Sequence, residues 1–187
     1  MKKVFIIHGF KGAPNGGWRP WLMRELDKHG VFACALEMPT PDAPKLDEWL
    51  KEVAYHMDKQ NPADEIYLVG HSLGATTVLR YLELEDARSV SGVVLASGLI
   101  KSLDRADLEE FVQDPFNFEV IRSKALLRTV IHGEDDDRVP FEHAQILSHE
   151  IDAELIPVPN GGHLNGKSGW YELPQALEML LKWIKPF

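Results

Sequence analysis

One segment of the chain reads Ile66-Tyr67-Leu68-Val69-Gly70-His71-Ser72-Leu73-Gly74, and the architecture follows from it. Its first four residues form a short apolar run of the kind found in a strand that is buried on both faces. Apolar side chains then recur at helical spacing, at Val78, Leu79 and Leu82. Between the two elements, residues 70–74 match the pattern Gly-x-Ser-x-Gly, which in this setting forms a sharp turn with an exposed serine hydroxyl. We therefore predict that Ser72 is a nucleophile at the end of a strand.

Two backbone N–H groups are predicted to lie next to this serine. The turn places the N–H of Leu73 at the N-terminus of the following helix, where it can stabilise a developing oxyanion. A second donor is expected from the loop after the first strand, which contains His8-Gly9-Phe10. Gly9 allows the backbone to come close to a substrate, so we predict the N–H of Phe10 as this donor. The alternative is an ordinary strand-ending turn in which His8 is a packed side chain.

The rest of the chain alternates short apolar runs with amphipathic helical patterns. Strands are expected at residues 4–7, 32–36, 66–69, 90–96, 127–131 and 153–158. Helices are expected at 18–26, 46–57, 141–151 and 173–184, in addition to the one after Ser72. This alternation predicts one domain over residues 1–187, a three-layer α/β/α sandwich with about six mainly parallel strands. The irregular segment 97–123, with a short helix expected at 104–111, is either a short cap over the site or a packed surface loop.

A serine nucleophile needs a base, and the chain has eight histidines. One of them, His163, lies in Gly161-Gly162-His163-Leu164-Asn165, between the last predicted strand and the last predicted helix. Ligands bind at that end of an open α/β sheet, and the base is expected to come last in chain order. We therefore predict His163 as the base, His71 as a structural residue and His132 as a residue in or at the end of a strand. The remaining helical histidines are expected at the surface: His29, His56, His143 and His149.

The acid that orients the histidine is expected directly after the fifth strand, where the chain reads Gly133-Glu134-Asp135-Asp136-Asp137-Arg138-Val139-Pro140. The spacing favours Asp136. Asp135 is the first alternative, Asp104 is a more distant one, and the sequence does not separate Asp137 from its neighbours with certainty. The predicted constellation of Ser72, Asp136 and His163 performs acyl transfer to water.

These motifs resemble a known family. The similarity rests on His8-Gly9-Phe10, on Trp18-Arg19-Pro20-Trp21-Leu22, on the turn at 70–74 and on residues 161–165 with Gly169 and Pro174. Over essentially its whole length, the chain is similar to the small serine hydrolases of the retinoblastoma-binding-protein-nine type and their bacterial relatives. The resemblance implies a compact α/β-hydrolase fold that lacks the first strands of larger members. It also implies a triad of Ser72, Asp136 and His163, with esterase-like or peptidase-like activity.

One property of that family is not expected here. A member binds the retinoblastoma protein through an L-x-C-x-E motif. The only cysteine of this chain, Cys34, has Phe32 two residues before it and Leu36 two residues after it, so the motif is absent. Binding of the retinoblastoma protein is therefore not supported.

Composition narrows the expected partners. The formal net charge is −9 and no basic run is longer than Lys2-Lys3, which argues against a nucleic-acid partner. No window approaches the roughly 18 apolar residues of a membrane span, so no membrane partner is expected. A single cysteine excludes an internal disulfide and fits a reducing compartment, and the expected location is cytoplasmic. Clustered metal ligands are absent from the sequence pattern, and neither a metal nor another cofactor is expected.

The expected reaction is cleavage of a carboxylic ester, thioester or amide of a small acyl substrate, in the carboxylesterase-like class. A non-catalytic binding module with the same fold is the alternative. The substrate pocket is expected to include aromatic side chains, unless these pack in the core: Phe10, Phe111, Phe116, Phe118 and Trp170.

Overall fold

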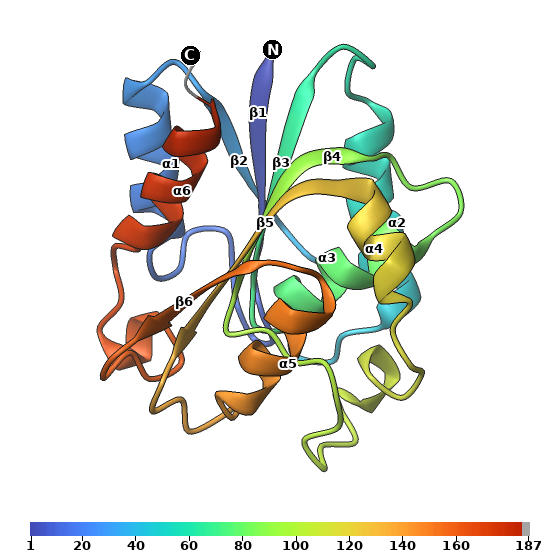
Figure 1. The fold of residues 1–187 in the computed structure, drawn as a ribbon, viewed down its shortest axis with the longest axis vertical. Helices are drawn as coiled ribbons and strands as arrows, with labels where there is room; N and C mark the ends of the chain where they lie inside the picture. Colours follow the sequence, from blue (N-terminus) through green and yellow to red (C-terminus); the bar gives the residue numbers. More distant parts are fainter. Residues whose placement is uncertain (185–187) are drawn as a thin grey trace.

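Six strands form one parallel sheet in the computed structural model, which describes residues 1–184 (Figure 1). They are β1 (Lys2–Ile7), β2 (Phe32–Leu36), β3 (Glu65–His71), β4 (Val90–Ala96), β5 (Ala125–Gly133) and β6 (Glu154–Val158). Their order across the sheet is β2-β1-β3-β4-β5-β6, and each neighbouring pair is parallel. The helices are α1 (Arg19–Lys28), α2 (Leu46–Asp58), α3 (Leu73–Glu83), α4 (Phe118–Lys124), α5 (Glu142–Glu150) and α6 (Pro174–Ile184). The predicted α/β/α sandwich is confirmed.

Each face of the sheet carries its own apolar core. Successive side chains of a strand point to opposite faces, so Val4 and Ile6 of β1 join one core while Phe5 and Ile7 join the other. Helices α1 and α6 cover the first face, and α2, α3, α4 and α5 cover the second (Figure 1). Because both faces are covered, the strands read as continuous apolar runs in the sequence.

The position of the site follows from the strand order. On one side of β1 lies β2, and on the other side lie β3 and all later strands. In an open parallel sheet a crevice forms at the carboxyl ends of the two strands between which the strand order reverses, here β1 and β3. Ile7 of β1 pairs with Gly70 of β3, so the two strands end at the same level. The loop after β1 and the turn after β3 therefore meet at this edge of the sheet.

The segment 97–123 is mostly irregular. Instead of a helix over 104–111, it contains only the short 3-10 helix η1 (Glu109–Phe111), and α4 begins near its end. Asp104 has a φ of +56°, in the left-handed region, which a right-handed helix does not tolerate. The predicted helix is therefore wrong for residues 104–108. A second 3-10 helix, η2 (Gly166–Ser168), precedes α6.

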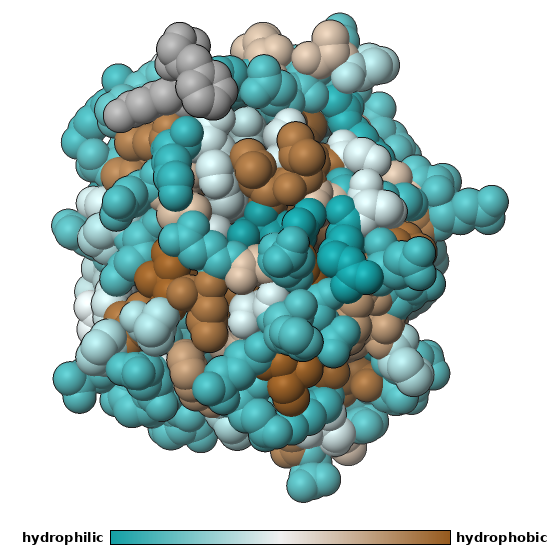
Figure 2. All heavy atoms as spheres, in the orientation of Figure 1, coloured by the Kyte–Doolittle hydropathy of each residue, from teal (hydrophilic) through white to brown (hydrophobic). Residues whose placement is uncertain are grey.

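The face of the molecule in Figure 2 carries scattered apolar groups. Figure 2 shows several separate apolar patches among hydrophilic side chains on one face. Large exposed apolar side chains come from distant parts of the chain: Phe32, Tyr55, Leu126 and Tyr171. Exposure of this kind is normal and does not by itself mark an interface. Within residues 1–184, none of the helices has the length and apolar character that crossing a membrane requires.

Candidate active site

Ser72 lies on a strained turn between β3 and α3. Its φ is +54° and its ψ is −122°, a conformation that a non-glycine residue adopts only when the surrounding structure enforces it. The turn is possible because its two flanking glycines lack side chains. A Cβ on Gly70 would collide with the backbone of Ala75, and a Cβ on Gly74 would collide with the carbonyl group of Ile7. The turn raises the serine hydroxyl above the end of β3, as the sequence predicts.

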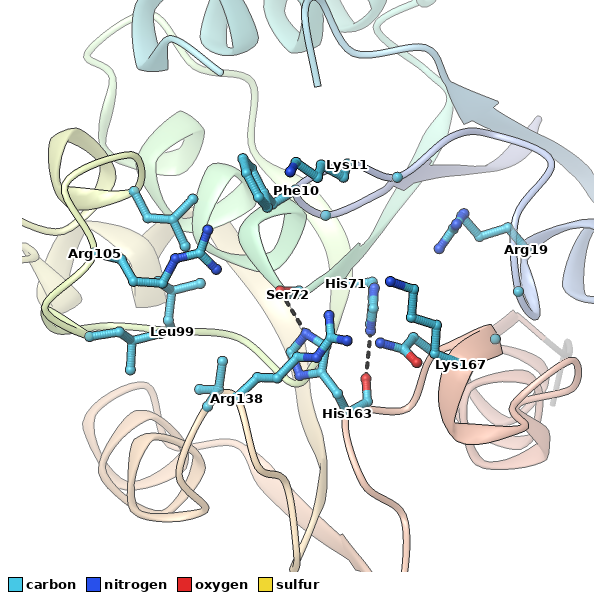
Figure 3. Close-up of a pocket in the computed structure, with 18 of the residues that line it drawn as sticks. Phe10, Lys11, Arg19, His71, Ser72, Leu99, Arg105, Arg138, His163 and Lys167 are labelled. Atoms are coloured by element: carbon cyan, nitrogen blue, oxygen red, sulfur yellow. Dashed lines mark hydrogen bonds between the residues drawn. The ribbon is translucent and has the colours of Figure 1, made fainter. Parts of the chain in front are cut away.

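A chain of hydrogen bonds connects three of the predicted residues, and Figure 3 shows the bond between Ser72 and His163. The hydroxyl of Ser72 lies 2.9 Å from Nε2 of His163. On the other side of the ring, Nδ1 of His163 lies 2.8 Å from Oδ2 and 3.1 Å from Oδ1 of Asp136. The three side chains follow β3, β6 and β5, respectively, at the carboxyl end of the sheet. Residues that are far apart in the sequence thus form one relay.

Asp136 is held as a carboxylate by its surroundings. Its side chain is fully buried, and Oδ1 accepts hydrogen bonds from the backbone N–H groups of Arg138 (2.9 Å) and Val139 (3.0 Å). Burial alone raises the pKa of Asp136, but hydrogen bonds from His132 and His163 outweigh it and hold that pKa well below its ordinary value. A buried carboxylate with this many donors can orient the imidazole and stabilise its protonated form.

The structure distinguishes among the alternatives for the acid. Asp135 points elsewhere and accepts a hydrogen bond from the N–H of Gly162 at 2.8 Å. Asp137 and Asp104 are exposed. Only Asp136 of these four aspartates hydrogen-bonds to His163 among the described residues.

His132 is a contact of the acid that the sequence did not predict. It lies one residue before the end of β5 and is completely buried, and its Nε2 lies 2.8 Å from the carbonyl oxygen of Val139 and 3.3 Å from Oδ2 of Asp136. Its place in the strand was predicted, but its contact with the acid depends on how the following loop folds back. The only signal in the sequence was the position of His132 immediately before the acidic loop.

Two buried aromatic side chains fix the loop that carries His163. Nε2 of His71 donates to the carbonyl oxygen of His163 at 2.9 Å (Figure 3). The indole N–H of Trp18 donates to the carbonyl oxygen of Leu164, also at 2.9 Å. Burial lowers the pKa of His71 to about 3, and the neighbouring His163 adds to this effect. His71 is therefore neutral at physiological pH, and its role in positioning agrees with the structural role predicted for it.

The two predicted oxyanion donors have free N–H groups. Among residues 1–184, neither Phe10 nor Leu73 donates its backbone N–H to another protein group. A Cβ on Gly9 would lie only 2.8 Å from Cβ of Ser72, so this loop passes directly against the serine. The loop is fixed by His8, whose Nε2 accepts from the N–H of Met38 (3.3 Å) and whose Nδ1 donates to the carbonyl oxygen of Gly9 (2.9 Å). His8 is thus both packed and part of the support for this loop.

A cavity of about 420 Å³ opens above Ser72 and His163. One part of its wall is apolar and is formed by Phe10, Leu99, Leu103, Leu108 and Val139. All three leucines come from the segment 97–123, which therefore covers part of the site. The cavity also has polar and basic lining residues, among them Arg19, Asn165 and Lys167.

Of the five aromatic residues predicted for the pocket, Phe10 lines this cavity and the other four do not. Phe111 is completely buried and packs edge-on against Trp49 in the core. Phe116 and Phe118 stack on each other, and the guanidinium of Arg80 lies 3.6 Å from the ring centre of Phe116. Trp170 packs against the core beside α1 and α6. For these four residues the prediction was wrong, because their side chains pack against other parts of the fold, which a local sequence pattern does not show.

Residues 1–184 contain no group of three or more His, Cys, Asp or Glu side chains arranged to hold a metal ion.

The comparisons with known proteins agree with this architecture. The model of the family described as "Serine hydrolase" matches residues 4–182, nearly the whole chain. The chain belongs to the serine hydrolase family. This serine hydrolase is similar to YdeN of Bacillus subtilis (strain 168), with 38% identity over 181 residues, covering 96% of this chain and 94% of YdeN. It is 25% identical over 186 residues to the rat protein "Serine hydrolase RBBP9", covering 96% and 95% of the two chains.

Solved structures show the same fold. The crystal structure of the B. subtilis ydeN gene product matches this serine hydrolase with a TM-score of 0.92 and 37% identity, covering 98% of both chains. A YdeN-like protein from Pectobacterium atrosepticum matches with a TM-score of 0.75 at 17% identity, covering 98% of this chain and 90% of the other. The second likeness shows the fold alone. Membership of the resembled family and the α/β-hydrolase fold are both confirmed.

Two buried histidines are expected to make the fold sensitive to acid. Burial is the main cause that lowers the pKa of His71 to about 3 and that of His143 to about 4, from an ordinary value of 6.5. Between these values the folded protein keeps both rings neutral, whereas the unfolded chain protonates them. Above about pH 6.5 both rings are neutral in the folded and in the unfolded state, so they do not change the free energy of unfolding. Below that pH they lower it. The free energy of unfolding should fall from about pH 6.5 to about pH 4, by up to about 1.4 kcal/mol per pH unit for each group.

His143 provides the test of this pH dependence. It was predicted at the surface, but it is buried, because it lies on the core-facing side of α5 and accepts the N–H of Ile100 through Nδ1 at 3.2 Å. In His143→Asn, the amide oxygen can replace that acceptor without titrating. Denaturant unfolding from pH 7 to pH 4 should show a shallower loss of stability in this variant than in the unmodified protein. Equal slopes would contradict the assignment.

Proposed function

We propose that this serine hydrolase cleaves a carboxylic ester of a small acyl substrate through Ser72, His163 and Asp136. The observation that carries the proposal is the unbroken relay from the hydroxyl of Ser72 through both nitrogens of His163 to the buried carboxylate of Asp136. Nucleophile, base and orienting acid are each within hydrogen-bond distance of the next, which is the geometry that this chemistry needs.

The proposed reaction has two halves. In the first, Nε2 of His163 takes the proton of Ser72 as its oxygen attacks the ester carbonyl. The N–H groups of Phe10 and Leu73 stabilise the negative oxygen of the tetrahedral intermediate. His163 then gives its proton to the departing alcohol, and the acyl group remains on Ser72.

In the second half, His163 takes a proton from water, and the resulting hydroxide attacks the acyl-enzyme. A second tetrahedral intermediate collapses, His163 returns its proton to Ser72, and the carboxylic acid leaves. Throughout, Asp136 holds the imidazole and stabilises its protonated form. The cavity volume of about 420 Å³ lies toward the lower end of the range of small-molecule pockets. Esters of short acids are the proposed substrates.

An active-site-directed fluorophosphonate tests the reactivity of Ser72. Intact mass measurement should show one adduct on the unmodified protein and none on Ser72→Ala. Ser102→Ala is the matched control, because Ser102 is exposed on the segment beside the cavity and does not line it; it should be labelled like the unmodified protein. An adduct on Ser72→Ala, or no adduct on the folded unmodified protein, would refute the proposal. The second result would favour a binding module with this fold.

A further inference from the structure

The charges around the cavity oppose those of the chain as a whole. The protein has 29 acidic and 20 basic residues and a formal net charge of −9. The cavity, in contrast, is lined by five basic side chains, namely Lys11, Arg19, Arg105, Arg138 and Lys167, and by no aspartate or glutamate within residues 1–184. Asp136 lies behind His163 and does not line the cavity. A low-dielectric cleft lined by one sign of charge attracts ligands of the other sign.

Arg19 is the most informative of these residues. It begins α1 and is only 6% exposed. Its Nε donates to the carbonyl oxygen of Ala13 at 2.9 Å, but the described residues provide no carboxylate and no acceptor for its two terminal nitrogens. Both terminal nitrogens remain accessible from the cavity, so a ligand bound there can supply the partner that the protein does not.

The fold leaves room for the unpaired guanidinium. The guanidinium passes close to Gly16, where a Cβ would lie 2.7 Å from Nη2 of Arg19. Burial lowers the pKa of Arg19 to about 10, and the side chain is therefore still protonated at neutral pH. Figure 3 shows the guanidinium directed into the cavity.

Lys167 lies on the same side of Ser72 as Arg19, and Leu99 and Arg105 lie on the opposite side (Figure 3). Lys167 is exposed and forms no ion pair with the described residues. Arg105, in contrast, is paired with Asp107. Lys11 and Arg138 also line the cavity without an ion pair to the described residues. Arg19 and Lys167 are thus two of four unpaired cations there, and the opposite side combines Leu99 with the paired Arg105.

We propose that the substrate of this site is an ester that also carries an anionic group, such as a carboxylate, and that Arg19 and Lys167 bind this group. The inference rests on the proposed function, because it defines the substrate class of the Ser72 site. Two unpaired cations can each donate a charge-assisted hydrogen bond to such a group.

Two pairs of esters test the inference, with hydrolysis followed by titration of the acid released. Monoethyl adipate and ethyl hexanoate differ only in a terminal carboxylate on the acyl side. The butanoyl ester of γ-hydroxybutanoate and butyl butanoate differ in the same way on the alcohol side. In at least one of the two pairs, the protein should hydrolyse the anionic ester with a kcat/KM about ten- to hundredfold higher than that of its neutral partner. High salt should reduce this preference.

The variants are Arg19→Met and Lys167→Met, and the measured quantity is the ratio of kcat/KM for the anionic ester to that for its neutral partner. Each should lower the ratio by about tenfold or more. Arg24→Met is the matched control, because it removes the same charge from an exposed position on the same helix, outside the cavity. Its ratio should stay close to that of the unmodified protein. Lys167→Met keeps the test valid if the buried Arg19 is needed for folding.

The outcomes separate this inference from the proposed function. If Ser72 takes the fluorophosphonate but neither pair shows a preference, the anionic substrate is refuted and the hydrolase remains. The same holds if the preference survives in both Met variants. Calorimetric titration of Ser72→Ala with monoethyl adipate and with the butanoyl ester of γ-hydroxybutanoate needs no turnover. Binding that is lost on adding Arg19→Met or Lys167→Met supports the site, and the absence of binding of both ligands overturns it.

Discussion

Replacing Ser72 or His163 by alanine is expected to lower kcat for ester hydrolysis by roughly 10⁴- to 10⁶-fold. Without the hydroxyl there is no nucleophile to form the acyl-enzyme. Without the imidazole, the hydroxyl of Ser72 keeps its proton and the alcohol leaves unprotonated. The two residues act in one step, so the double variant Ser72→Ala with His163→Ala should be little slower than either single variant.

His149→Ala is the control for these measurements. His149 is exposed on α5, away from the cavity, and its loss should leave kcat close to that of the unmodified protein. Thermal unfolding of each variant should first establish that the fold is intact. Single variants with less than about tenfold loss, or losses that multiply in the double variant, would argue against a shared step.

Asp136→Asn is expected to lower kcat by roughly 10³- to 10⁴-fold at neutral pH. Oδ1 of Asp136 accepts two backbone N–H groups and Oδ2 faces Nδ1 of His163. In asparagine, the single carbonyl oxygen is needed by the two backbone donors, so the NH2 group faces His163. Nδ1 must then act as an acceptor, which places the ring proton on Nε2. In that tautomer Nε2 cannot take the proton of Ser72.

Asp137→Asn is the matched control for the acid. It removes the same charge from the adjacent, exposed position, and kcat should stay close to that of the unmodified protein. The comparison uses pre-steady-state kinetics with an activated aryl ester, together with unfolding measurements on both variants. If Asp137→Asn were the slower enzyme of the two, the assignment of the acid would be wrong.

Much of the fold could be predicted from the sequence because its signals are local. The run at 4–7 divides its side chains between two cores, and such runs identify buried parallel strands. The turn at Ser72 requires glycines on both sides, which the motif shows directly. His163 could be located because its loop follows the last strand of the sheet. Each of these features is visible within a few residues.

Other features depend on contacts between distant segments, and the sequence did not determine them. Three adjacent aspartates are chemically equal until the loop folds and brings one of them to His163. The burial of Phe111 depends on Trp49, which comes from another helix. The burial of His143 had a weak signal, because His143 and Leu147 share one face of a helix. The unpaired state of Arg19 is visible only once every possible carboxylate partner has been placed.

The acyl-enzyme on Ser72 is the central claim, and trapping it is the most direct measurement. The protein is mixed with an activated aryl butanoate, quenched in acid within the first turnover, digested, and mapped by peptide mass. The account predicts one butanoyl group, located on Ser72 and formed in a burst together with the released aryl alcohol. Butanoyl found on a different residue, or steady release of the alcohol with no acylated peptide, would contradict it.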